Sequence, residues 1–205
     1  MRLFALAAAA LLPALAAAQE SAPVIPEDPR APRFHEVEHG FFTGFEVGYL
    51  TLFKTPTADA GRFPLAPDGG GRSGGFLVGV NAGYDFSDRL ALSAYLLGAT
   101  SRASVSYGAF NLLSVGGDLR VTLFGARDRN GTERLHLYLH ARGGWLMTRP
   151  AGLFGNTDLF FAGGPGIEYD TQLRHFSVGL AVDGAYVAKA KAPGLAVTPT
   201  VRYTF

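Results

Sequence analysis

The sequence predicts an all-β protein whose eight antiparallel strands close into an up-and-down transmembrane β-barrel with a filled polar lumen. Three observations support this fold class. Apolar and polar residues alternate with a period of two in eight segments, as they do in strands that separate two environments. Within each segment, the charged residues all alternate in step with the polar face, and none lies on the apolar face. The last segment, 195–205, ends on Phe205, with Val201 and Tyr203 on the same apolar face and Arg202 on the opposite face.

Each segment is long enough for the roughly 9–11 tilted residues that a membrane-spanning strand needs. The eight predicted strands are 41–54, 75–86, 90–101, 113–125, 135–148, 159–170, 175–188 and 195–205. The first turns Phe, Val and Tyr outward and Glu46 inward. The second alternates aromatic and aliphatic residues around inward Asp85. The third, regular only in its first half, sets Leu outward and Tyr95 inward, and the fourth faces lipid with Val and Leu and the lumen with Asp118 and Arg120.

The later segments repeat the pattern. The fifth presents Leu, Trp and Met outward, with His136, His140 and Arg142 inward. The sixth and seventh have Phe, Ile, Val, Leu and Tyr outward and Glu168 and Asp183 inward. A lipid-facing cation at mid-membrane costs roughly 2–4 kcal/mol, which accounts for this segregation. A soluble sandwich would show the reverse arrangement, with its charges on the outer faces.

Eight strands enclose an interior just wide enough to be filled by side chains. Charges removed from water need partners, so the inward residues are expected to neutralise one another. The predicted lumen network comprises Glu46, Asp85, Asp118, Arg120, His136, His140, Arg142, Glu168, Asp183 and Arg202.

Two prolines conflict with a closed sheet, because proline lacks the N–H that a strand donates to its neighbour. A bulge or bend near 163–164 would accommodate Pro165. The sequence offers no explanation for Pro199.

The N-terminal 39 residues are predicted to lie outside the barrel. Residues 1–18 combine a positive start, an apolar run and an Ala-rich cleavage site near Ala18, as in a secretory signal peptide. Residues 19–39 begin with four prolines among charged residues and are predicted to form an extended periplasmic tail, leaving 40–205 as the barrel. The chain has no cysteine, which excludes disulfides and thiolate metal sites.

With both termini in the periplasm, the connections divide into two sets. The predicted periplasmic turns are 87–89, 126–134 and 171–174, and the predicted outer loops are 55–73, 102–112, 149–158 and 189–194. A formal net charge of +1, without a basic run, gives no indication of nucleic-acid binding.

The terminal strand, ending Tyr203-Thr204-Phe205, resembles the closing strand of bacterial outer-membrane β-barrels. That resemblance implies outer-membrane lipid around the barrel. It also implies that the barrel-assembly machinery recognises Val201, Tyr203 and Phe205 as an assembly signal.

A narrower resemblance covers 161–186, which contains Ala-Gly-Gly-Pro-Gly-Ile-Glu-Tyr and Leu-Arg-His-Phe-Ser-Val-Gly-Leu, and extends to 198–205. These stretches are similar to the small outer-membrane proteins of adventurous gliding motility in myxobacteria. The resemblance implies a non-enzymatic structural or interaction component of an envelope complex for motility or adhesion, with envelope or motility proteins as partners. It brings no catalytic residue, cofactor or metal.

Two alternatives remain open. Ser114, Asp118, His136 and His140 share the inward parity of neighbouring strands, so a Ser-His-Asp grouping in a lipid-modifying enzyme is conceivable. Ionisable residues at membrane depth also allow a narrow channel.

Overall fold

The computed structural model describes residues 40–53, 72–102, 109–128, 131–149, 157–171, 173 and 175–205. The predicted signal peptide, the predicted tail and large parts of the first three predicted outer loops lie outside these residues. Eight strands are present: β1 (Phe41–Leu52), β2 (Ser73–Ser87), β3 (Leu90–Arg102), β4 (Ala109–Arg127), β5 (Glu133–Arg149), β6 (Asp158–Asp170), β7 (Phe176–Val187) and β8 (Ala192–Thr204).

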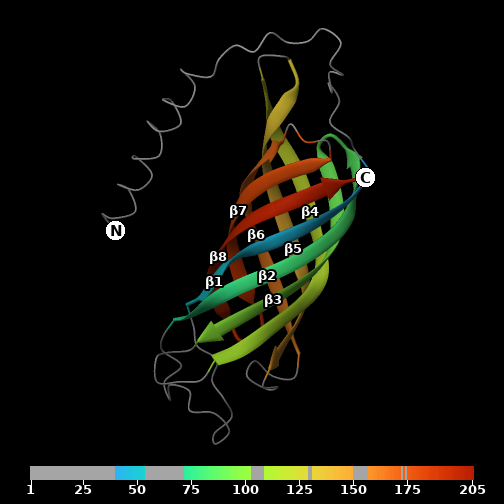
Figure 1. Ribbon diagram of the computed structural model, residues 1–205. Coiled ribbons are helices and arrows are strands. Elements are labelled where there is room, and N and C mark those ends of the chain that lie inside the picture. The colour runs from blue at the N-terminus through green and yellow to red at the C-terminus, as the bar shows by residue number, and fades with distance from the viewer. Residues whose placement is uncertain are drawn as a thin grey trace, which may run out of the picture. The chain divides into compact units, whose positions relative to one another are not determined.

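The strands form one closed antiparallel barrel in which each strand pairs with its neighbours in sequence and β1 pairs with β8 (Figure 1). The predicted fold class is therefore confirmed. The described ranges contain no helix that is long and apolar enough to cross a membrane.

Five strands begin earlier than the alternation predicts. β2, β4, β5, β6 and β8 start at Ser73, Ala109, Glu133, Asp158 and Ala192 instead of 75, 113, 135, 159 and 195. Backbone pairing continues beyond the predicted starts, with Leu52 opposite Ser73 and Arg102 opposite Ala109, although the side chains no longer alternate in polarity. Three of the four predicted outer loops, 102–112, 149–158 and 189–194, were therefore too long, because hydrogen bonding and not polarity decides where a strand begins.

The barrel has two distinct ends. The turn end carries Gly40, Phe205 and the connections 88–89, 128–132 and 171–175, whereas the loop end carries the connections 53–72, 103–108, 150–157 and 188–191. At the turn end the β4–β5 hairpin continues beyond the last β3–β4 pair, Leu90 with Val121, and projects from the barrel (Figure 1). Register shifts between Thr122 and Phe124 and between Ala126 and Arg127 bend this hairpin.

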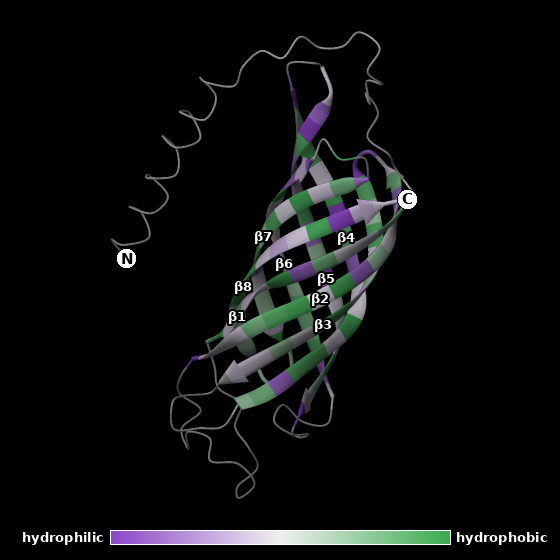
Figure 2. Cartoon of the chain, viewed as in Figure 1, coloured by the Kyte–Doolittle hydropathy of each residue, from purple (hydrophilic) through white to green (hydrophobic). Residues whose placement is uncertain are grey.

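Between the strand ends, the outward-facing residues that the structure describes carry no charge. Burial alternates along every strand, and Phe45, Leu96, Leu119 and Val178 are among the exposed apolar side chains. Figure 2 shows hydrophobic colour spread over the strands and polar colour near the tip of the projecting hairpin. A continuous apolar exterior of this extent is what a hydrocarbon environment requires and water disfavours.

The prolines are accommodated without the expected bulge. β6–β7 pairing skips Pro165 and resumes at Gly166 in unchanged register, and β8–β1 pairing skips Pro199 and resumes at Thr200. On the other side of each strand, Pro165 stays paired with β5 and Pro199 with β7. Of the bulge or bend expected near 163–164, the bulge is absent, because the β6–β7 register does not shift there. Each strand residue directs its N–H toward one neighbour, so a proline interrupts a single ladder.

An arginine in the middle of the exterior should be poorly tolerated. Leu96 lies at the centre of β3 and faces outward with 47% of its surface exposed. We expect Leu96→Arg to lower the free energy of unfolding in liposomes by about 2–4 kcal/mol and Leu90→Arg, at the turn end, by about 0–1 kcal/mol. Equal effects of both variants in denaturant titrations would contradict a lipid-facing exterior.

Candidate functional site

The lumen contains three layers of side chains. The mid-lumen cluster comprises Glu46, Asp118, His140, Arg142 and Asp183. The turn-end cluster comprises Asp85, Arg120, His136, Glu168, Asp170 and Arg202. The apolar plug, on the loop-end side, comprises Leu50, Leu52, Leu77, Leu97, Phe110, Leu112, Leu146, Phe160 and Val187.

Arg142 is the centre of the mid-lumen cluster. Its two terminal nitrogens donate to the two carboxylate oxygens of Glu46, at 2.8 and 3.1 Å, in a bidentate pair. The Nη2 atom of Arg142 also lies 3.1 Å from Asp118. Glu46 is only 1% exposed, so this pair joins strands on opposite sides of the barrel away from bulk water.

His140 continues the chain of contacts from Asp118 to Asp183. Its Nδ1 lies 3.2 Å from both carboxylate oxygens of Asp118, and its Nε2 lies 2.6 Å from Asp183. Both ring nitrogens thus face acceptors, an arrangement that the imidazolium form satisfies with an N–H on each side. The cluster therefore links β1, β4, β5 and β7 through five side chains.

Tyr95 closes the cluster on its loop-end side. The guanidinium of Arg142 lies 5.3 Å from the centre of the Tyr95 ring, and the Tyr95 hydroxyl hydrogen-bonds to Ser114 at 3.1 Å. A Cβ at Gly144 would lie 2.2 Å from the Val115 carbonyl oxygen and 2.7 Å from the Tyr95 hydroxyl oxygen. The backbone of β4 and the tyrosine ring together therefore require glycine at this position.

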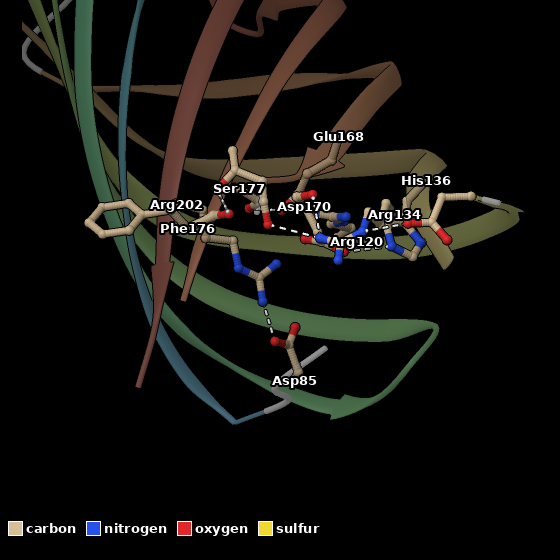
Figure 3. A network of polar contacts seen from close by, with 11 residues as sticks. Asp85, Arg120, Arg134, His136, Glu168, Asp170, Phe176, Ser177 and Arg202 are labelled. Atoms are coloured by element: carbon tan, nitrogen blue, oxygen red, sulfur yellow. Dashed lines mark hydrogen bonds and ion pairs between the residues drawn. The ribbon is translucent and has the colours of Figure 1, made fainter. Parts of the chain in front are cut away.

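The turn-end cluster pairs two arginines with carboxylates from other strands (Figure 3). Arg120 donates to Glu168, which also accepts from the Ser177 hydroxyl, and Arg202 donates to Asp85. Arg120 stacks on Tyr138 at 4.0 Å and Arg202 on Phe42 at 3.7 Å. The aromatic ring contacts the planar face of each guanidinium, and the carboxylate accepts hydrogen bonds at its edge, so each arginine is held from two directions.

The projecting hairpin is tied to the barrel by His136 and Arg134. His136 Nε2 lies 2.8 Å from the Asp170 carboxylate. Arg134 donates to Asp128 at 2.9 Å and to the Thr171 carbonyl at 3.1 Å. The hairpin and the β6–β7 turn are therefore held together by charged contacts.

Two small cavities lie among the charged clusters. One of about 50 Å³ is lined by turn-end residues, one of about 70 Å³ extends to the mid-lumen cluster, and both border Arg120, Glu168 and Arg202. They offer polar space for a few water molecules.

The apolar plug was not anticipated by the sequence prediction of a polar lumen. Leu52 and Phe110 are 1% exposed and Val187 is fully buried. A signal for it exists in the sequence. Near the loop end of most strands both parities are apolar, as in Leu96-Leu97, Leu146-Met147 and Phe160-Phe161. Polar filling of the lumen thus describes the turn-end and middle layers, whereas hydrophobic packing dominates the loop-end layer, with the buried hydroxyls of Ser73, Ser101 and Thr148 among the apolar side chains.

The structure places all ten residues of the predicted network inside the barrel. Five of them form the mid-lumen cluster, four form the Arg120–Glu168 and Arg202–Asp85 pairs, and His136 contacts Asp170. Sequence reasoning missed Asp170, Arg134 and Ser177 as members, since they lie at strand ends or carry no charge. Parity identified which side chains face inward but could not identify their partners.

The conceivable Ser-His-Asp grouping is not assembled. Asp118 contacts His140, but Ser114 bonds to Tyr95 and is opposite Leu146 in the β4–β5 ladder. Leu146 and His140 are six positions apart along β5, which corresponds to roughly 20 Å. Ser114 is therefore too distant to be activated by that histidine.

The residues of the predicted assembly signal lie at the turn end of β8. Val201 is exposed on the exterior, and Tyr203 packs edge-on against Phe176 and Phe205 at 5.0 Å each. The Phe205 N–H donates to the Phe41 carbonyl at 2.8 Å. Recognition of these residues by the assembly machinery stays a prediction.

The architecture defines the class: the chain has the fold of small eight-stranded outer-membrane β-barrels. It is similar to Neisserial surface protein A, with 15% identity over 80% of this chain and 97% of that chain and a TM-score of 0.58. Outer membrane protein AlkL (11% identity; 88% and 97% covered; TM-score 0.49) and the Yersinia pestis attachment invasion locus protein Ail (15%; 82% and 100%; 0.42) are more distant matches. No protein-family model and no curated protein matches the chain, so the narrower resemblance to gliding-motility proteins stays a prediction.

Removing Arg142 should cost far more than removing an exposed arginine. Arg142→Met leaves Glu46 buried without its cation and Asp118 with His140 alone, so we expect the free energy of unfolding to fall by about 3–5 kcal/mol. The Glu46→Gln/Arg142→Met double variant should lose less than the sum of the single variants. Denaturant titration in liposomes measures both effects.

The control is Arg127→Gln, which breaks the exposed Arg127–Glu133 pair at 3.1 Å. Its cost should stay below about 1 kcal/mol. If Arg142→Met were no more harmful than this control, the mid-lumen cluster would not stabilise the barrel.

Proposed function

We propose that the protein is a non-enzymatic outer-membrane barrel that acts as a structural and interaction component of an envelope complex. The observation that carries this proposal is the filled lumen. Paired charges occupy its middle and turn-end layers, and the apolar plug occupies its loop-end layer. With the interior used for packing, the surfaces left for function are the two ends.

Placement in the bacterial outer membrane is supported by the apolar exterior together with the fold class. In this proposal residues 1–18 direct export and are removed near Ala18, and residues 19–39 extend into the periplasm. Both segments lie outside the described residues.

The projecting β4–β5 hairpin is the contact surface that the described residues favour at the turn end. It extends past the barrel and is held by Arg134 and His136 contacts. Phe124, 65% exposed beside exposed Leu123, gives it an apolar patch beyond the last β3 pair. A rigid ribbon with an exposed aromatic is well suited to bind another protein.

The finer assignment, to a gliding-motility or adhesion complex, rests on the resemblance of 161–186 and 198–205. Lipid modification and a narrow channel are the competing functions. The lumen geometry argues against both, because Ser114 lies far from His140 and the plug fills the loop-end side.

A filled lumen should not conduct ions. We expect the purified barrel to give no stepwise single-channel current in planar bilayers, because buried Leu52, Phe110 and Val187 belong to the apolar plug that packs the loop-end side of the lumen. A general diffusion porin in the same bilayers serves as the positive control. Reproducible current steps from the barrel would favour the channel function instead.

A photoreactive amino acid at Phe124 should crosslink an envelope protein in living cells. The matched control is the same amino acid at Leu96, which faces outward at the centre of β3 and should crosslink lipid. Mass spectrometry of the adducts identifies the partner. Identical adducts at both positions would argue against the hairpin as the contact surface.

Deletion of the gene distinguishes the finer alternatives. Reduced movement over surfaces with an unchanged lipid A mass spectrum is expected for a motility component. Normal motility would exclude that assignment, and altered lipid A would favour an enzyme.

A further inference from the structure

The exterior of the loop end differs in charge from the rest of the barrel wall. Arg72 precedes β2, Arg149 ends β5, and Lys189 and Lys191 lie between β7 and β8, all exposed to solvent. The sole acid among the described loop-end residues is Asp158, which is 2% exposed and accepts hydrogen bonds from the backbone of Leu159, Lys189 and Ala190. Among the described residues, no ion pair involves Arg72 or Arg149.

The amino-acid sequence extends this imbalance to the whole loop end. The stretches 53–72, 102–109, 149–158 and 188–191 contain seven basic and three acidic residues. The turn-end stretches 87–90, 127–134 and 170–175 contain five basic and four acidic residues. Two of these basic residues, Arg127 and Arg134, are paired with carboxylates. By sequence, the loop-end stretches therefore carry a formal net charge of +4 (7 − 3) and the turn-end stretches one of +1 (5 − 4).

An aromatic belt lies next to the loop-end cations, on the side toward the middle of the barrel. Tyr49, Phe53, Phe76 and Trp145 are 48–64% exposed on the exterior. Trp145 precedes Arg149 by four residues of β5, or roughly 13 Å along the strand. Aromatic side chains of this kind mark the boundary of the hydrocarbon, so the cations beyond them reach the level of the lipid headgroups.

Arg72 connects the loop-end cations with the aromatic belt. Its guanidinium lies 5.7 Å from the centre of the Phe53 ring. Guanidinium groups bind phosphate through paired N–H donors, and a phosphomonoester carries close to two negative charges at neutral pH.

We propose that the loop-end cations form a collar that binds the phosphate groups of a phosphorylated glycolipid in the surrounding outer leaflet. The inference rests on the membrane placement in the proposed function and adds the class of lipid to it. Each cation near an anionic membrane surface should contribute about fivefold in affinity.

The test uses the folded full-length mature barrel in phosphatidylcholine nanodiscs that contain bisphosphorylated lipid A or the same lipid A without its phosphates. Native mass spectrometry counts the lipid A molecules retained per barrel across a titration. We expect retention of the phosphorylated lipid only. Arg72→Gln/Arg149→Gln should weaken that binding roughly 25-fold.

The matched control is Arg89→Gln/Arg127→Gln, which removes two exposed arginines at the turn end. It should bind lipid A like the unaltered barrel. Equal retention of both lipids, or equal losses in both double variants, would overturn the collar while leaving the envelope function standing. A barrel that fails to insert into phosphatidylcholine nanodiscs, judged by heat-modifiable migration in gels, would overturn the membrane placement and the collar together.

Discussion

Closure of the sheet is the constraint on which everything else in this structure depends. A strand in hydrocarbon cannot leave backbone N–H and C=O groups unpaired, so β1 must find β8 at the far end of the chain. The register that joins Phe42 to Thr204 and Leu52 to Gly194 achieves this, and the Phe205 N–H adds a further bond to Phe41. Once closed, the barrel assigns every residue to lipid or to lumen.

That assignment concentrates charge in a narrow interior, where desolvation is costly unless each group has a partner. Arg142 and His140 bridge carboxylates from three other strands. The turn-end arginines pair with carboxylates and also stack on aromatic rings. The network resembles a set of crosslinks between opposite walls. Its stabilising role follows from its connectivity, since each charged side chain of the two clusters contacts at least one group of opposite charge.

Filling the interior moves function to the ends, and the two ends are built differently. The turn end carries an aromatic rim and a projecting hairpin whose charges are internally paired. The loop end carries cations above an aromatic belt and closes the lumen with apolar side chains. In our proposals, the turn end binds another protein and the loop end binds lipid headgroups, although all eight strands belong to the same regular barrel.

The sequence by itself determined the strand count, the parity and the exclusion of charge from the exterior, because hydrocarbon penalises every misplaced charge locally and strongly. It did not determine which inward charges meet. Glu46 and Arg142 are 96 residues apart and pair only because closure and register bring their strands face to face. The tertiary structure also decided how Pro165 and Pro199 are accommodated and where apolar packing replaces ion pairs, since both depend on neighbours that a period of two cannot specify.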